Sequence, residues 1–388
     1  MLLIKNLKIT DTAYGGAGVG RSEDGQVVFI NNTVEGDIVN ARVIEDKKDF
    51  LNAQLDKIIK PSRLRIKPLC PYSKDCGGCS FAHIDYDAQI NIKENIIKNA
   101  LRKYPFELPK INVFKSATIG YRLRVKAQAR KGKVGFYAHK SQDFVSVENC
   151  VIIKERLFSK IKTFAEKNEV TGSIYAIENE EGISLAFINA ENIHLIDAAI
   201  FDGMSVNGKK YGLSKMNFNT PYGAVSVNHS SFFQANRYLL EQFQERGISL
   251  VFNGLNIVEL YAGAGFFSSG LQTAGSYTGC ECDKAASELG KNLGYNIKNM
   301  KAEQFIEKLS SCDTLFLDPP REGVSKKVIN EIMRLRPFEI IYVSCNPITL
   351  ARDIMKLSDS YKILSYDFFD MYPNTYHIES IVKLIRYN

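Results

Sequence analysis

The sequence predicts a multidomain α/β protein with a small N-terminal β-barrel, a central and mostly antiparallel β region, and a C-terminal doubly wound, Rossmann-like α/β domain. The chain has 388 residues, more than a typical single domain of about 150 residues. Short alternating apolar segments fill its first part, and apolar strands alternate with helical stretches in its last part. We place the three regions at residues 1–60, 61–230 and 231–388.

Charge and hydropathy exclude a membrane protein. Fifty Lys and Arg against 43 Asp and Glu give a net charge of +7, which suits a polyanionic partner but also occurs in ordinary enzymes. There is no apolar run of about 18 residues and no signal-peptide pattern at the start. We therefore expect a cytoplasmic protein, and separately we expect it to be a monomer.

The first 60 residues predict a small barrel. The segments LLIKNLKIT, GQVVFINNT, DIVNARVIED and LNAQLDKII are separated by turn signals such as YGGAGVG and EDG. Barrels of this size often bind oligonucleotides, although a solvated basic barrel without a ligand has the same pattern. The residues expected to contact phosphates are Arg42, Lys47, Lys48, Lys57 and Lys60.

The eight cysteines need a role other than disulfide bonding, because cytosolic thiols stay reduced. Cys70, Cys76 and Cys79 lie close together in CPYSKDCGGCSF, and Cys150 is the nearest candidate for a fourth ligand. Four thiolates suit either zinc or an iron–sulfur cluster; the alternative is three loop cysteines and a core Cys150. The cysteines expected to be small core residues are Cys280, Cys282 and Cys312.

The central region begins with a helix expected over 84–104, which is a candidate to pack on the C-terminal domain, and continues as strands such as GYRLRVKAQAR and KVGFYAH. Basic residues alternate with aromatic ones there, a pattern that holds phosphates and stacks bases. A charged outer sheet face gives the same alternation. The candidate RNA contacts are Arg122, Arg124 and Lys131.

Strands spaced by helices in the C-terminal region predict a ligand crevice at the strand carboxyl ends. The first loop, after LNIVEL, reads YAGAGFF and lacks the third glycine of the dinucleotide fingerprint, while Glu281 ends the next strand. These features favour S-adenosylmethionine. Later loops add Asp318 before two prolines, Cys345 in SCNP, and Glu379 before the last strand.

The motifs LDPPREG, SCNPITLARD, HIESIVKL and SFFQAN, with the four-cysteine pattern, resemble those of the RNA uracil-5-methyltransferases, which include 23S rRNA and tRNA thymine-54 enzymes. The resemblance spans nearly the whole chain, and its first sixty residues resemble the TRAM barrel. It implies S-adenosylmethionine as methyl donor. It also implies a [4Fe-4S] cluster on Cys70, Cys76, Cys79 and Cys150, as in the rRNA-modifying branch.

Uracil C5 is too weak a nucleophile to take a sulfonium methyl until a thiolate adds at C6. Cys345 is the expected thiolate, and the resemblance makes Glu379 the base that removes the C5 proton. The thiol needs surroundings that lower its pKa, for which Arg352 is a candidate. Taken singly, Cys345 and Glu379 could equally be a buried strand-end thiol and a surface carboxylate.

The target base must leave its stack, and by resemblance Phe232 fills the gap, although singly it could be a core aromatic. Phe266 stands where relatives commonly have Asn, so a contact there would come from the backbone. The residues implied to bind the cofactor are Gln234, Tyr261, Gly263, Gly265, Phe266, Glu281 and Asp318.

The cysteine pattern favours 23S rRNA as the substrate. Three alternatives stay open: the same reaction on tRNA at the thymine-54 position, methylation of another base or an amino group, and a redox-responsive RNA-binding protein without catalysis.

Overall fold

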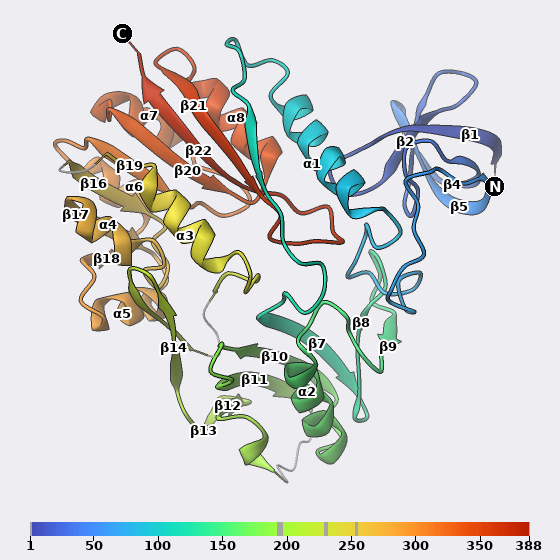
Figure 1. Cartoon of the computed structure of the whole chain (residues 1–388), viewed down its shortest axis with the longest axis horizontal. Helices are drawn as coiled ribbons and strands as arrows, with labels where there is room; N and C mark the ends of the chain where they lie inside the picture. The colour runs from blue at the N-terminus through green and yellow to red at the C-terminus, as the bar shows by residue number, and fades with distance from the viewer. Residues whose placement is uncertain (1, 192–196, 229–231, 253–254, 388) are drawn as a thin grey trace. The chain divides into compact units, whose positions relative to one another are not determined.

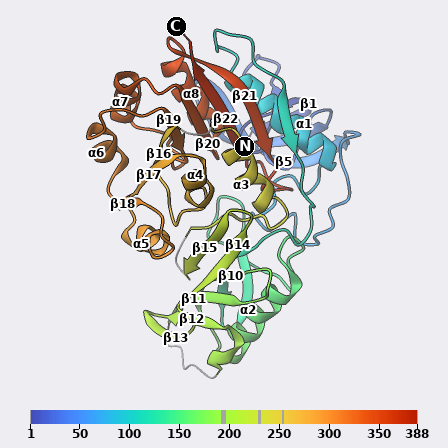
Figure 2. The same cartoon turned by 60° about the vertical axis from the view of Figure 1, so that its left-hand side comes forward.

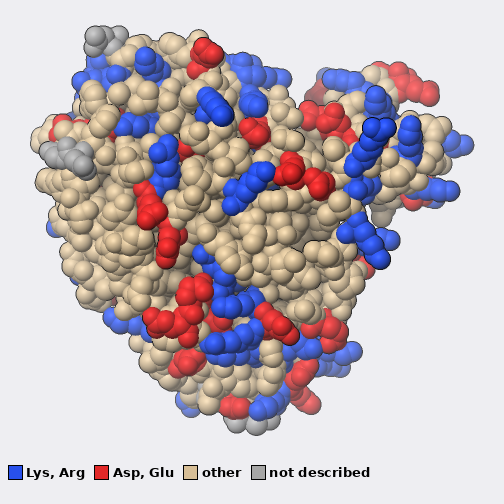
Figure 3. All heavy atoms as spheres, viewed as in Figure 1, with Lys and Arg blue, Asp and Glu red and all other residues tan. Residues whose placement is uncertain are grey.

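The computed structural model describes residues 2–191, 197–228, 232–252 and 255–387 (Figure 1). The chain divides into two compact units, of which the first comprises residues 1–99, 136–147 and 372–377 and the second the remainder. No helix in the described ranges is long and apolar enough to span a membrane. Basic and acidic side chains are interspersed over the face seen in Figure 3.

The predicted barrel is confirmed as five strands in the closed order β1-β2-β3-β5-β4. Alternate apolar side chains, among them Ile9, Val28 and Val39, fill its interior, which explains the period-two pattern of the sequence. The strands are β1 (Leu3–Thr12), β2 (Gly18–Arg21), β3 (Val27–Ile30), β4 (Ile38–Asp46) and β5 (Phe50–Lys60).

A buried ion pair fastens the barrel to the segment that follows it. Asp37 is fully buried and lies 2.7 Å from a guanidinium nitrogen of Arg65. The same carboxylate accepts hydrogen bonds from the backbone N–H groups of Val34 and Ser62, at 2.8 and 2.9 Å. Burial alone would raise the pKa of Asp37, but these donors together hold it below its ordinary value.

Helix α1 (Tyr86–Ala100) lies within the range predicted for a helix. Its Gln89 amide donates to the carbonyls of Phe81 and Ile84 and accepts from the backbone N–H of Asn374. Lys93, also on α1, donates to the carbonyl of Tyr372 at 3.2 Å. The helix therefore holds the short segment 372–377, which precedes the last strand of the chain.

The central sheet has the order β13-β12-β11-β10-β7-β8-β9, antiparallel at each described pair except β11–β12. Helix α2 (Glu155–Lys167) packs on β10, and the two-stranded β14–β15 hairpin lies beside the sheet (Figure 2). The strands are β7 (Arg124–Arg130), β8 (Lys133–Tyr137), β9 (Phe144–Ser146), β10 (Gly172–Glu178), β11 (Ser184–Ala190), β12 (Gly203–Val206), β13 (Lys209–Gly212), β14 (Lys215–Thr220) and β15 (Gly223–Asn228); a 3-10 turn, η1, covers Ala198–Ile200.

The C-terminal domain is built on an eight-stranded sheet with the order β18-β17-β16-β19-β20-β22-β21-β6. Its strands are β6 (Ile111–Phe114), β16 (Asn256–Leu260), β17 (Ser276–Glu281), β18 (Ile297–Asn299), β19 (Thr314–Leu317), β20 (Glu339–Ser344), β21 (Tyr361–Phe369) and β22 (Glu379–Arg386). Its helices are α3 (Leu240–Ser249), α4 (Ser268–Ala274), α5 (Lys284–Asn292), α6 (Ala302–Glu307), α7 (Lys326–Leu335) and α8 (Pro347–Leu357).

Five neighbouring strands of this sheet, β16 to β20, are parallel, and β22 runs antiparallel beside β20. The strand order reverses between β16 and β19. A doubly wound sheet binds its ligand at such a switch point, outside the carboxyl ends of the strands. Edge strand β6 comes from the chain before the central sheet and pairs in parallel with β21.

Candidate active site

The switch point is bounded by the residues that follow β16 and β19. Leu260 and Leu317 end these strands as register partners, and the backbone N–H of Asp318 donates to the Leu260 carbonyl at 3.4 Å. Tyr261 and Asp318 therefore emerge side by side at the crevice. Tyr261 has a φ of 65°, a left-handed conformation that is strained for a bulky side chain and is typical of functional sites.

The glycine loop after β16 owes its shape to two left-handed residues, Gly263 (φ 56°) and Gly265 (φ 91°). A Cβ on Gly265 would lie 2.4 Å from the Tyr295 ring, whereas one on Gly263 would meet nothing within 4 Å. Gly265 is thus needed for packing as well as conformation. Gly263 faces open space, so its backbone can approach a ligand closely.

Glu281, at the end of β17, braces this loop. Its carboxylate accepts the backbone N–H of Gly263 at 2.9 Å and that of Asp283 at 2.7 Å. Beneath the loop, buried Glu259 accepts hydrogen bonds from Ser268 and Tyr277, each at 2.5 Å. Burial raises the pKa of Glu259 to about 8, so this hydrogen-bonded carboxyl is a structural group that is mostly protonated at neutral pH.

Asp318 follows β19 and enters Pro319 and Pro320, which fix the backbone direction. Burial, together with the nearby charge of Glu281, raises the pKa of Asp318 to about 7. A cation placed in the crevice would favour the ionised form of this carboxyl and so lower its pKa.

Cys345 and Glu379 lie at the same edge of the sheet. Ser344 and Ser380 are register partners in β20 and β22, so the residues next to them, Cys345 and Glu379, adjoin one another across this pair of strands. Burial raises the pKa of Cys345 to about 12, and the carboxylates of Glu379 and Asp318 add to that rise. Burial and Asp318 likewise raise the pKa of Glu379 well above its ordinary value.

The cation that opposes these shifts is Arg321, which the sequence analysis did not single out. Its charge lowers the pKa of both Cys345 and Glu379. The Arg321 carbonyl accepts the Asn346 amide and the Thr349 hydroxyl, each at 3.0 Å. These bonds join the loop after β19 to the loop that carries the thiol.

The expectation that Arg352 lowers the pKa of Cys345 is wrong. The Arg352 guanidinium is 2.9 Å from buried Asp353 and donates to the Glu322 carbonyl at 2.7 Å. Asp353 in turn accepts the backbone N–H of Val324 at 2.9 Å. Because Asp353 neutralises the charge of Arg352, this guanidinium is not the cation that acts on Cys345. Its hydrogen bond to the Glu322 carbonyl instead holds the loop that contains Arg321.

The segment that contains Phe232 and Gln234 precedes α3. Phe232 is 70% exposed, with the guanidinium carbon of Arg124 5.3 Å from its ring centroid. This excludes a core role for Phe232. Gln234 is buried, and Phe233 between them stacks on Phe218 with ring centroids 4.2 Å apart.

Phe266 turns its ring into the hydrophobic core. The ring packs edge-on against Phe233 at 5.9 Å and against Phe267 at 4.9 Å, while the Phe266 carbonyl accepts the Gln244 amide. A polar side-chain contact to a ligand is therefore absent at this position.

The three basic residues predicted to contact RNA do not form one cluster. Arg122 donates from Nε to the Arg124 carbonyl at 3.1 Å, so these two lie at the start of β7, near Phe232. Lys131 lies beyond the opposite end of that strand, in the left-handed turn to β8 (φ 48°), where its N–H donates to the Thr171 hydroxyl.

The four cysteines proposed as cluster ligands belong to two different compact units of the chain. Cys70, Cys76 and Cys79 belong to the first unit, where Cys76 and Cys79 line one small pocket with Gly77; Cys150 belongs to the second unit. All four thiols are outside disulfides and partly exposed, which suits metal ligation. In the described parts of the chain, no three His, Cys, Asp or Glu side chains are grouped closely enough to hold a metal ion.

Two of the three cysteines expected in the core are buried, namely Cys280 and Cys312. The expectation for Cys282 is wrong, because this residue is exposed. It follows Glu281, the last residue of β17, so it belongs to the loop rather than to the buried strand.

Comparison with known proteins covers both ends of the chain. A family model described as tRNA (uracil-5-)-methyltransferase matches residues 284–387, and a TRAM domain model matches residues 4–55. An RNA methyltransferase of Caldanaerobacter subterraneus subsp. tengcongensis is 30% identical, with 97% of each chain covered. One of Aquifex aeolicus is 28% identical, with 98% of each chain covered.

A solved structure shares the fold along the whole chain. It is that of Pyrococcus abyssi tRNA (uracil-54, C5)-methyltransferase in complex with S-adenosyl-L-homocysteine, with a TM-score of 0.79 and 22% sequence identity. The alignment covers 98% of this chain and all of the other. The strand order and the crevice at the switch point therefore belong to a methyltransferase fold.

Proposed function

The chain belongs to the RNA uracil-5-methyltransferase family, and we propose that it methylates C5 of a uridine in 23S rRNA through a covalent intermediate on Cys345. One observation carries the mechanism. Asp318 and Cys345 follow the carboxyl ends of β19 and β20, and Glu379 opens the antiparallel strand β22 beside Cys345, so that both carboxylates raise the pKa of the thiol.

In this mechanism the Cys345 thiolate adds to C6, forming an S–C6 bond and moving the electron pair of the C5–C6 bond into the C4 carbonyl as an enolate. S-adenosylmethionine supplies the methyl group that C5 takes up, together with a positive charge in the crevice. Glu379 then removes the C5 proton, and the returning electron pair expels the Cys345 thiolate from C6.

The residues around the crevice have distinct tasks. Asp318, Glu281 and the backbone of the glycine loop would hold the cofactor, while Gln234 and Tyr261 would complete its site. Phe232 would fill the space left by the flipped uridine, with Arg124 beside it. Phe266 would contribute only its backbone.

The mechanism is tested with labelled methyl donor and transcripts of 23S rRNA and tRNA. Wild-type protein should label a uridine, and Cys345→Ala should abolish labelling. Glu379→Gln should still form the S–C6 bond but release the RNA slowly, so a protein–RNA adduct should accumulate on a denaturing gel. Labelling by Cys345→Ala would overturn the covalent mechanism.

The choice of RNA rests on the four cysteines, which resemble those of the rRNA-modifying branch. Mapping 5-methyluridine in rRNA and tRNA from a strain without this gene would decide between the two substrates. Loss from tRNA alone would favour the thymine-54 reaction. A 5-fluorouridine RNA that traps no adduct would favour another base, and RNA binding with no methyl transfer would favour the redox-responsive binding protein.

We further propose that Cys70, Cys76, Cys79 and Cys150 hold a [4Fe-4S] cluster with a structural role. The donor chemistry supports this, since four cysteine thiols that form no disulfide suit such a cluster. Iron and acid-labile sulfide in anaerobically purified protein, both lost in Cys76→Ser, are the expected result. Normal folding and activity in a cluster-free variant would contradict the structural role.

A further inference from the structure

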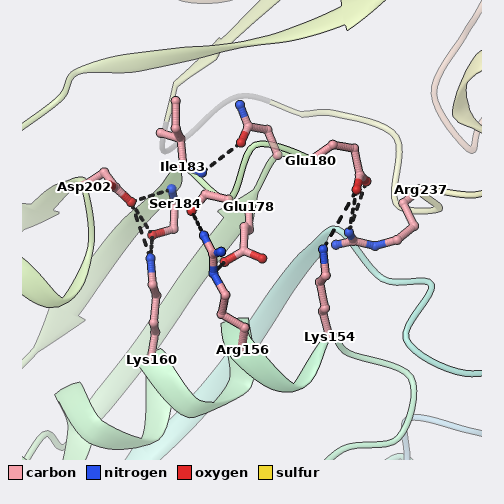
Figure 4. Close-up of polar contacts among 11 residues, drawn as sticks. Lys154, Arg156, Lys160, Glu178, Glu180, Ile183, Ser184, Asp202 and Arg237 are labelled. Carbon is pink, nitrogen blue, oxygen red and sulfur yellow. Dashed lines mark hydrogen bonds and ion pairs between the residues drawn. The ribbon is translucent and has the colours of Figure 1, made fainter.

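The central sheet has one face covered by α2. Side chains of a strand alternate between its two faces, and on β10 the buried residues Ile174 and Ala176 share a face with Glu178. Glu178 is bound by Arg156 of α2 at 3.1 Å, which identifies this face as the side of the helix. Figure 4 shows that Lys160 of α2 also reaches the sheet, beside Ser184 and Asp202.

The opposite face carries a row of basic and aromatic side chains. Lys126 of β7, Tyr175 of β10 and Phe187 of β11 are register neighbours. The Lys126 ammonium lies 4.9 Å from the Tyr175 ring centroid, and the Tyr175 and Phe187 rings are 6.0 Å apart. We call Lys126, Tyr175 and Phe187 the open-face row; all three are at least partly exposed.

The open-face row continues towards the proposed active site. Arg124 lies two residues before Lys126 on the same face of β7, and its guanidinium carbon is 5.3 Å from the Phe232 ring. The described strand positions on this face of β7, β8 and β10 to β13 include no Asp or Glu. The cations at these positions are Arg124, Lys126, Arg130, Lys133 and Lys210.

We propose that the open-face row binds single-stranded nucleotides flanking the target uridine of the RNA. Tyr175 and Phe187 stack on bases, while Lys126 and Arg124 bind the phosphates between those bases and the nucleotide at Phe232. Charge complementarity and continuity with Phe232 argue for RNA as the occupant. The inference rests on the proposed function, in which Phe232 fills the space left by the flipped base.

The test measures binding of the full-length protein to a fluorescein-labelled single-stranded RNA of roughly 12 nucleotides, within the site size of single-strand binders. Tyr175→Ala with Phe187→Ala should weaken binding at least about 25-fold, since each lost stack costs roughly 5- to 150-fold. Tyr175→Phe keeps the ring and should bind as wild type does. Lys126→Gln should make the plot of log affinity against log salt concentration less steep, by the slope that corresponds to about one phosphate contact.

Tyr211 provides the matched control. It is partly exposed, has Lys209 5.4 Å from its ring, and lies on the same sheet. Its register partner Met204 pairs with Ala186, whose partner Ala176 is on the α2 side, so Tyr211 faces away from the open-face row. Tyr211→Ala should therefore leave RNA affinity unchanged.

The inference is overturned if the double variant binds as tightly as wild type, if Tyr211→Ala weakens binding equally, or if the fully paired duplex of the same sequence binds as well as the single strand. In methyl-transfer assays the double variant should raise KM for RNA while kcat stays within about twofold, because the reacting groups are untouched. Failure of the proposed function is distinguished by a wild-type protein that binds this RNA but transfers no methyl group.

Discussion

At the scale of single residues, the site combines the proposed nucleophile with two carboxylates that oppose its ionisation. Cys345 reacts only as a thiolate, yet Glu379 and Asp318 raise its pKa, and Arg321 is the neighbouring cation that lowers it. The Arg321 guanidinium, outside the motif that carries the proposed nucleophile, therefore favours the thiolate that the proposed mechanism needs.

We expect Arg321→Gln to raise the pKa of Cys345 further. At pH 8 the thiolate fraction, and with it the rate of alkylation by iodoacetamide, should fall by about tenfold for each unit of pKa. Arg321→Lys should recover part of the rate because it keeps the charge. An unchanged pH profile of alkylation would show that Arg321 does not act on the thiol.

We expect Asp318, as a proposed cofactor ligand, to make cofactor binding depend on pH. Its pKa of about 7 means that the carboxyl is mostly neutral at pH 6 and mostly ionised at pH 8. Because the sulfonium of S-adenosylmethionine favours the ionised form, affinity measured by calorimetry should rise by about tenfold from pH 6 to 8. Neutral S-adenosyl-L-homocysteine should change less, and Asp318→Asn should abolish the difference between the two ligands.

At the scale of elements, the barrel and the parallel strands followed from local patterns. Period-two alternation predicted β1, β3, β4 and β5, whereas β2 lies in the YGGAGVG segment that was expected to be a turn. Strands spaced by helices predicted β16, β17, β19 and β20, but the three-residue β18 was not foreseen. Strand β6 was not foreseen, because INVF has no distinctive pattern and its partner strand lies far along the chain. The core packing of the Phe266 ring and the exposure of Cys282 could not be predicted either, because burial of these side chains is decided by the tertiary fold.

The ion pair of Asp37 and Arg65 makes the barrel sensitive to acid. The lowered pKa of Asp37 stabilises the fold fully above pH 3.8, its ordinary pKa, and this contribution is lost as pH falls through the lower folded-state value. Asp37→Asn should cost about 3 kcal/mol at pH 7, measured by urea unfolding with hydrogen exchange in the barrel. The deficit should shrink below pH 3.8.

Asp56→Asn is the control for this prediction. Asp56 pairs with Arg42 at 2.8 Å in the same barrel, but the Arg42 side chain is 58% exposed. Such a pair contributes at most about 1 kcal/mol. Equal losses in Asp37→Asn and Asp56→Asn would contradict the special role of Asp37.

At the scale of the whole molecule, the chain contributes one strand to the catalytic sheet before it forms the central sheet. Strand β6 is held by Asp367 of β21, which is fully buried, accepts the Asn112 amide at 2.7 Å and lies 2.8 Å from Arg246 of α3. The stacked rings of Phe114 and Phe369, 4.1 Å apart, add an apolar contact. The integrity of the catalytic sheet edge therefore depends on residues 111–114.

Asp367→Ala should release β6, because it leaves Asn112 and Arg246 without their shared acceptor. Removing one partner of a buried pair costs about 3–5 kcal/mol, so residues 111–114 should lose hydrogen-exchange protection while the barrel keeps its own. Glu307→Gln, which removes a solvent-screened pair to Lys327 whose two side chains are 57% and 47% exposed, should leave the protection of β6 unchanged. Unchanged protection of β6 in Asp367→Ala would mean that the strand is held by its backbone ladder and the Phe114 stack alone.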